Sequence, residues 1–105
     1  MHAGVRYLLG DEFAGLIHAY LEDTQQFVRE MQGACERDNF SAIEVPAHSM
    51  KSSSANIGAM RLSTLARELE EQIRSGSPVD VEGQVRTLAD EFDRVRQALK
   101  TKISG

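Results

Sequence analysis

This sequence has almost no cysteine and no long apolar run, and each shortage excludes a class of protein. Cys35 is the only cysteine among the 105 residues, so no internal disulfide and no cysteine-rich metal site can form. Its expected role is that of a small buried hydrophobe. No apolar run approaches the roughly 20 residues that a membrane span requires, and the N-terminus lacks a basic region followed by an apolar segment. The sequence therefore predicts a cytoplasmic protein that does not bind a membrane.

Positive charge is also scarce. Twelve lysines and arginines stand against sixteen acidic residues, which gives a formal net charge of −4, and the basic residues are scattered along the chain. A nucleic-acid-binding surface needs clustered basic residues, so nucleic acid is not an expected partner. Apolar residues make up 41% and charged residues 27%, an ordinary balance for a folded soluble chain. At this length we expect residues 1–105 to form a single domain.

Apolar residues recur every three or four positions in four segments, which is the pattern of amphipathic helices. No segment alternates apolar and polar residues for long enough to predict a strand. Short connectors make sequential helices neighbours, so the sequence predicts an all-α fold, an antiparallel up-down four-helix bundle. The residues of the four stripes are Phe13, Leu16, Ile17, Tyr20, Leu21, Phe27, Val28 and Met31; Phe40, Ile43, Ala47, Met50 and Ile57; Leu62, Leu65, Ala66, Leu69 and Ile73; and Val81, Val85, Leu88, Phe92, Val95 and Leu99.

The expected helix ends follow from capping chemistry. Asp38 and Asn39 can cap the second helix. Gly76 stands where a left-handed C-terminal cap is expected. Ser77 and Pro78 then suit the N-cap and the first position of the last helix, and Asp80 can complement its amide-rich end.

Two further features concern the second helix and the start of the chain. Pro46 removes an amide inside the second apolar segment, so we expect either a kink or a helix that starts late. Val5, Leu8 and Leu9 have helical spacing between two glycines, which predicts a short additional N-terminal helix at one end of the bundle.

His48 lies in the stretch AHSMKSSSANIGA, residues 47–59, among side chains too small to cover it. At about 100° of rotation per residue, it projects roughly 130° away from the apolar centre between Ala47 and Met50. An arbitrary histidine is more often a core residue, but this geometry predicts that His48 faces outward. Lys51 is the only long side chain that follows it on the same face.

Three kinds of chemistry are candidates for such a residue. A metal site is disfavoured, because Lys51 would repel the ion and neither His2 nor His18 has a partner pattern. Serine catalysis is disfavoured, because residues 52–54 have no strained turn around them and no second base nearby. A phosphoryl carrier remains, since an ordinary imidazole is mostly neutral at pH 7 and has one ring nitrogen free to attack phosphorus.

The 24 residues AHSMKSSSANIGAMRLSTLARELE, 47–70, resemble the signature of histidine-containing phosphotransfer (HPt) domains. The predicted order of helices resembles that family over nearly the whole chain. The residues in matching places are His48, Lys51, Ser54, Gly58, Leu65 and Leu69.

The resemblance implies a role for each part of the site. His48 would accept a phosphoryl group from the aspartyl phosphate of a receiver domain and yield it to another receiver. Lys51 would steer and neutralise the phosphate, and Gly58 would help to pack the histidine helix. The chain would be a carrier without catalytic turnover of its own and without a metal or cofactor, because the receiver holds Mg²⁺. A monomer is expected on separate grounds, because one bundle uses all of the apolar faces. Its partners would be response-regulator receiver domains and a hybrid sensor histidine kinase.

Small side chains beside His48 would allow a receiver to close over it. The family usually has glycine four residues after the histidine, where this chain has Ser52. An apolar rim of Val45 with Leu8 or Leu9 would add affinity for the receiver, although burial of these residues against the end of the bundle is an equally good explanation. The expected docking residues are Val45, Ser52, Ala55, Asn56, Ala59, Leu8 and Leu9.

Two alternatives stay open at this point. One is a helical adaptor that binds receiver domains without carrying phosphate, although an adaptor has no need of an outward imidazole beside Lys51. The other is the HPt domain of a hybrid histidine kinase, separated from the rest of that enzyme. The chain has no glycine-rich nucleotide-binding motif, so we do not expect a kinase domain within it.

Overall fold

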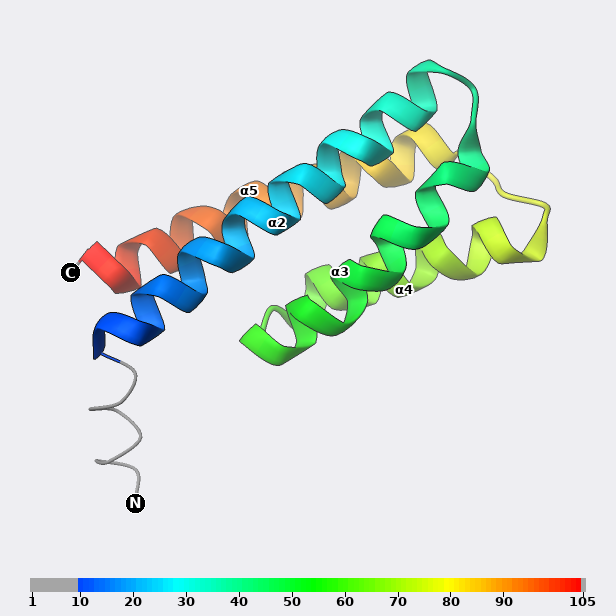
Figure 1. The fold of residues 1–105 in the computed structure, drawn as a ribbon. Helices are drawn as coiled ribbons and strands as arrows, with labels where there is room; N and C mark the ends of the chain where they lie inside the picture. Colours follow the sequence, from blue (N-terminus) through cyan, green and yellow to red (C-terminus); the bar gives the residue numbers. More distant parts are fainter. Residues whose placement is uncertain (1–9, 105) are drawn as a thin grey trace.

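The computed structural model describes residues 10–104, which form four α-helices and one short 3₁₀ helix (Figure 1). No strand occurs within these residues, and the predicted all-α fold is confirmed. The predicted N-terminal helix with Leu8 and Leu9 lies outside the described residues. The elements are α2 (Gly10–Glu36), η1 (Phe40–Ile43), α3 (Glu44–Ile57), α4 (Met60–Ser75) and α5 (Val81–Ser104).

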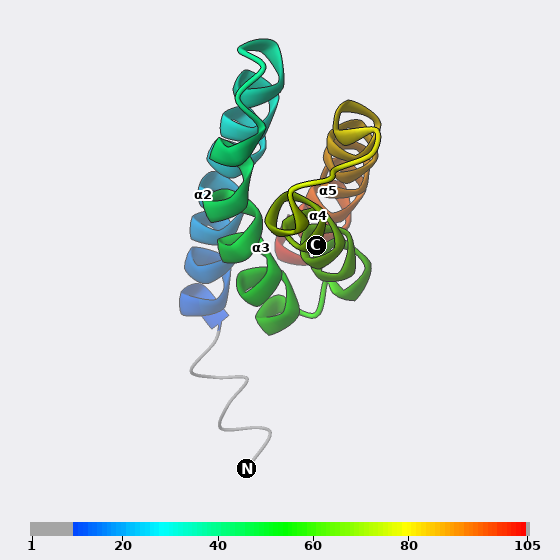
Figure 2. The same cartoon turned by 90° about the vertical axis from the view of Figure 1, so that its right-hand side faces the viewer.

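The helices form an antiparallel up-down bundle, as predicted. Each helix contacts the next one along the chain, and α5 returns alongside α2. The two long helices, α2 and α5, lie next to each other over much of their length, and the shorter α3 and α4 form a hairpin packed against them (Figures 1 and 2). The histidine helix α3 therefore contacts both α2 and α4, and these two neighbours hold its position.

The predicted apolar stripes supply the core. Residues of all four stripes, among them Ile17, Met50, Leu69 and Leu88, are completely buried. Leu16 is the exception, since it belongs to the predicted stripe of α2 but is 57% exposed. It directly precedes Ile17, which is completely buried, and points about 100° away from it around the helix.

The structure corrects two predicted caps. Neither Asp38 nor Asn39 makes a side-chain capping hydrogen bond at η1. The last helix begins at Val81 and not at Pro78, because the Asp80 carboxylate accepts a hydrogen bond from the Gly83 amide at 3.2 Å and so caps α5. The left-handed cap at Gly76 is confirmed, with φ of 77°.

Pro46 is accommodated by a late helix start, which is one of the two predicted outcomes. The 3₁₀ turn η1 brings the chain to Glu44, where α3 begins. Pro46 is thus the third residue of α3, in the first turn, where backbone amides have no partner within the helix. Its ring is buried at no cost in hydrogen bonding.

Gly58 ends α3 by its backbone conformation and does not pack the helix, which corrects the expected role. It is the C-cap residue with φ of 88°, in the left-handed region, and its amide bonds to the carbonyl of Ala55. A Cβ atom built there would meet nothing within 4 Å. The glycine is therefore needed for the positive φ and not for close approach.

Substituting Gly58→Ala is expected to lower the free energy of unfolding by about 1–2 kcal/mol, because an L side chain is strained at positive φ. Urea denaturation followed by circular dichroism measures this loss. Gly15→Ala is the matched control, since Gly15 lies inside α2 and its added Cβ also meets nothing within 4 Å. That change should stabilise the fold by about 0.5–1 kcal/mol. A similar small gain at Gly58 would contradict the capping role.

Candidate functional site

His48 lies on the exposed side of α3, as its phase relative to the apolar stripe predicts. Ala47 and Met50, on either side of it in the sequence, are completely buried, whereas the His48 side chain is 58% exposed. The imidazole therefore stands at the surface, and its orientation is fixed by a residue from another helix.

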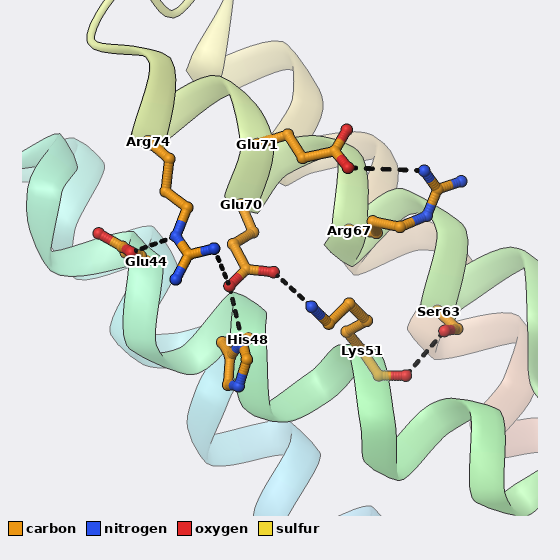
Figure 3. A network of polar contacts seen from close by, with 8 residues as sticks. All are labelled: Glu44, His48, Lys51, Ser63, Arg67, Glu70, Glu71 and Arg74. Carbon is orange, nitrogen blue, oxygen red and sulfur yellow. Dashed lines mark hydrogen bonds and ion pairs between the residues drawn. The ribbon is translucent and has the colours of Figure 1, made fainter.

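That residue is Glu70 of α4, whose side chain is only 2% exposed. Its Oε2 lies 2.6 Å from Nδ1 of His48, and its Oε1 accepts a hydrogen bond from Nζ of Lys51 at 2.9 Å (Figure 3). One buried carboxylate thus binds both residues that the sequence singled out.

The charge of Glu70 follows from this environment. Burial by itself would raise the pKa of the carboxyl group, but the hydrogen bonds from Lys51 and His48 outweigh burial and hold the pKa below its usual value. Glu70 is therefore ionised at neutral pH and can only accept hydrogen bonds.

An acceptor at 2.6 Å decides which ring nitrogen of His48 carries hydrogen. Nδ1 must carry it, because it faces the Glu70 carboxylate. In the neutral ring Nε2 then holds the free lone pair, and Figure 3 shows this nitrogen pointing away from Glu70. The site therefore presents a nucleophilic nitrogen to solvent in a fixed tautomer.

Arg74, one turn after Glu70, extends the network toward the start of α3. Its Nε donates a hydrogen bond to Oε2 of Glu44 at 2.8 Å, and its Nη1 lies 3.9 Å from Oε2 of Glu70 (Figure 3). The guanidinium therefore joins the first turn of α3 to the last turns of α4. An open pocket of about 220 Å³ beside the ring is lined by Glu44, Val45, His48, Ser49, Glu70 and Arg74.

Two hydroxyl groups fix the register of α3 against its neighbours. Ser63 of α4 donates a hydrogen bond to the backbone carbonyl of Lys51 at 2.7 Å. On the other side, Ser54 is completely buried and its Oγ lies 2.8 Å from the hydroxyl of Tyr20 in α2. The histidine helix is thus bonded to both α4 and α2, which makes the position of the imidazole rigid.

The expected docking residues do not all lie on one surface. Val45 is 74% exposed, and Ser52, Ala55 and Asn56 are exposed on α3 as well. Ala59 follows the end of α3 and packs partly buried against the core, so it is not part of the exposed helical face as expected. Leu8 and Leu9 lie outside the described residues.

A second apolar surface beside α3 was missed from the sequence. A groove of about 390 Å³ between α2 and α3 includes the exposed Leu16 and the partly buried Phe27 and Ile57. The signal for it was present, because the stripe of α2 carries one apolar residue more than the core can bury. Its full lining is Leu16, Tyr20, Asp23, Phe27, Ser49, Ser53, Asn56 and Ile57.

Glu70 was also missed, although the sequence places it directly after Leu69 of the third apolar stripe. A carboxylate at the edge of a core stripe indicates a buried polar contact, since such groups are seldom buried without a partner. The partner, His48, could be identified only from the packing of α3 on α4, because His48 and Glu70 are 22 positions apart in the sequence.

Neither a metal centre nor a membrane segment occurs in the part of the chain that the structure describes. No group of three or more histidine, cysteine, aspartate or glutamate side chains there could hold a metal ion. Among the helices within residues 10–104, none combines the length and the apolar character needed to cross a membrane.

Comparisons with known proteins agree with the observed fold. The family model of the Hpt domain matches residues 15–98. The crystal structure of histidine-containing phosphotransfer protein B (HptB) from Pseudomonas aeruginosa PAO1 superposes with a TM-score of 0.87 and 27% sequence identity, over 97% of this chain and 89% of that chain. No curated protein sequence matches the chain.

Proposed function

We propose that His48 is the residue that carries the phosphoryl group, starting from the fact that this chain belongs to the Hpt domain family. As a member of that family, the chain is a phosphotransfer intermediate of a two-component phosphorelay. The observation that carries the assignment is the exposed imidazole with Nδ1 bound to Glu70 and Nε2 free.

The chemistry assigned to His48 needs no other nucleophile. The lone pair of Nε2 attacks the phosphorus of a receiver's aspartyl phosphate, the P–O bond to the aspartate breaks, and the carboxylate leaves. The ring keeps its hydrogen on Nδ1 and becomes a phosphorylated imidazolium, whose positive charge Glu70 balances at 2.6 Å. Transfer to the next receiver reverses these steps, and the leaving group is then a neutral imidazole.

The remaining parts of the reaction are assigned to the partners. The receiver would supply Mg²⁺ and the aspartate, so the chain itself would act as a phosphohistidine carrier without turnover of its own and without a cofactor. Lys51, 31% exposed and bound to Glu70, would move toward the phosphoryl group once that group has arrived. A hybrid sensor kinase and response regulators are the proposed partners, and the relay is proposed to operate in the cytoplasm.

The receiver is proposed to dock over α3 and the groove between α2 and α3. Val45 and Ser52 lie within one turn of His48 and are exposed, and the exposed Leu16 adds apolar surface on the side of α2. Small side chains around the ring allow a partner to approach the Nε2 atom, and the apolar groove would contribute binding energy.

Label transfer tests the proposed function. A receiver domain carrying a labelled aspartyl phosphate should transfer the label to the chain, the label should be lost in acid, and the His48→Gln variant should take none. Label retained in that variant would overturn the choice of His48. Binding of receivers without any transfer of label would instead indicate an adaptor.

Ser52→Gln is expected to slow transfer from a phosphorylated receiver by about 10- to 100-fold, because a long side chain one turn from the ring would hold the partner's aspartate out of reach. Stopped-time labelling measures the rate, and circular dichroism should show an unchanged helix content. Thr87→Gln on the exposed face of α5 is the control and should transfer at the normal rate. Normal transfer in the Ser52 variant would contradict the proposed docking surface.

A further inference from the structure

The two sides of His48 differ in what they offer to a phosphoryl group. Nδ1 faces α4, where Glu70 binds it, so Nε2 points away from α4 (Figure 3). A phosphoryl group on Nε2 therefore stands on the side of the ring opposite Glu70. A side chain of α3 that lies on that side can reach the phosphoryl oxygens.

Helical geometry identifies the α3 side chain on the Nε2 side of His48. At about 100° per residue, Lys51 lies about 60° to one side of His48 around the helix axis, and Ser52 lies about 40° to the other. Glu44, four residues before His48, falls on the side of Lys51. Both Glu44 and Lys51 bond to residues of α4, which identifies their side as the one that faces α4. Ser52 is therefore on the side to which Nε2 points.

The hydroxyl of Ser52 is also the one that is available among the three consecutive serines. Ser53 donates to the carbonyl of Met50, and Ser54 bonds to Tyr20 in the core. Ser52 is exposed, and its hydroxyl makes no hydrogen bond to any other residue in the described range. Side chains on a helix lean toward its N-terminus, so the Ser52 hydroxyl leans toward the turn that holds His48.

The ammonium of Lys51 does not fill the same role in the structure. It bonds to Oε1 of Glu70 at 2.9 Å, on the α4 side of the ring, so its charge is already shared with a buried carboxylate. A donor that is free beforehand gives up no contact when the phosphoryl group arrives, whereas Lys51 must leave Glu70 to reach it.

We propose that the hydroxyl of Ser52 binds the phosphoryl group on Nε2 of His48 through a hydrogen bond and so favours the phosphorylated form of this chain. The proposal rests on the proposed function. Ser52 keeps its proton throughout, because it only donates the bond to a phosphoryl oxygen while the P–Nε2 bond forms and the P–O bond to the receiver's aspartate breaks. The contact exists only in the phosphorylated state, so it shifts the balance of phosphate between receiver and carrier.

The test is the equilibrium ratio of phosphorylated carrier to phosphorylated receiver. A purified receiver domain that phosphorylates the wild-type chain is loaded with acetyl phosphate, freed of the excess, mixed with each variant and followed to a constant ratio. Ser52→Ala should lower the ratio by about 2- to 10-fold, the effect of one hydrogen bond. Ser52→Gly should lower it similarly, and Ser52→Thr should restore it. Thr87→Ala on α5 is the matched control and should keep the wild-type ratio.

The outcomes separate this proposal from the proposed function. A wild-type ratio in Ser52→Ala, with the label still on His48, overturns the role of Ser52 and leaves the carrier function intact. Absence of label on wild-type His48 overturns the carrier function itself. A ratio lowered in Ser52→Ala and restored in Ser52→Thr supports the hydrogen bond, because a role in packing alone would not follow the hydroxyl.

Discussion

Replacing Glu70 with alanine is expected to slow phosphoryl transfer to His48 by about 10- to 100-fold, which is the usual effect of losing a group that orients a reactive side chain. Without the carboxylate at 2.6 Å, hydrogen on Nδ1 is no longer favoured over hydrogen on Nε2, and the ring can rotate. The phosphorylated imidazolium also loses the negative charge that balances it. Rapid-quench labelling from a phosphorylated receiver measures the rate.

Two variants separate charge from orientation. Glu70→Gln retains an oxygen that can accept from Nδ1 but removes the negative charge, so its rate should fall between those of the wild type and Glu70→Ala. Glu71→Ala is the control, because the Glu71 side chain is 63% exposed. Its carboxylate forms an ion pair with Arg67 of the same helix, at 3.7 Å, and not with His48. Equal rates in Glu70→Ala and Glu71→Ala would show that the tautomer is not fixed by Glu70.

The parts of the structure that depend on residues close together in the sequence could be predicted from the sequence. The four apolar stripes gave the helices and most of the core, because burial follows the period of the helix. The outward direction of His48 followed from the same rotation, measured from the buried Ala47 and Met50. The left-handed cap at Gly76 followed from the freedom of glycine at positive φ.

The parts that depend on two helices meeting could not be predicted in the same way. The partner of His48 lies 22 residues away on α4, and its identity depends on how α4 is rotated against α3. The exposure of Leu16 depends on how α3 lies against α2, which leaves a groove there. The start of α5 depended on Asp80, since one side-chain hydrogen bond to the Gly83 amide outweighed the favourable pairing of Ser77 with Pro78.

Leu69, the residue before Glu70, is expected to matter for stability and not for phosphoryl transfer. Leu69→Ala is expected to lower the free energy of unfolding by about 2–5 kcal/mol, because the side chain is completely buried and its loss leaves a cavity. Urea denaturation measures the change. Leu65→Ala is the matched control, since Leu65 is only partly buried on the same helix and should cost less.

Transfer should respond to the two neighbouring substitutions in the reverse order. At a temperature where Leu69→Ala is still folded, its Glu70 can still reach Nδ1 of His48, so the rate of transfer should fall far less than in Glu70→Ala. A rate in Leu69→Ala as low as in Glu70→Ala would mean that packing of α4 sets the reactivity of His48. The expected result would instead assign stability to the buried leucine and reactivity to the carboxylate beside it, because the carboxylate is the group that lies within hydrogen-bond distance of Nδ1.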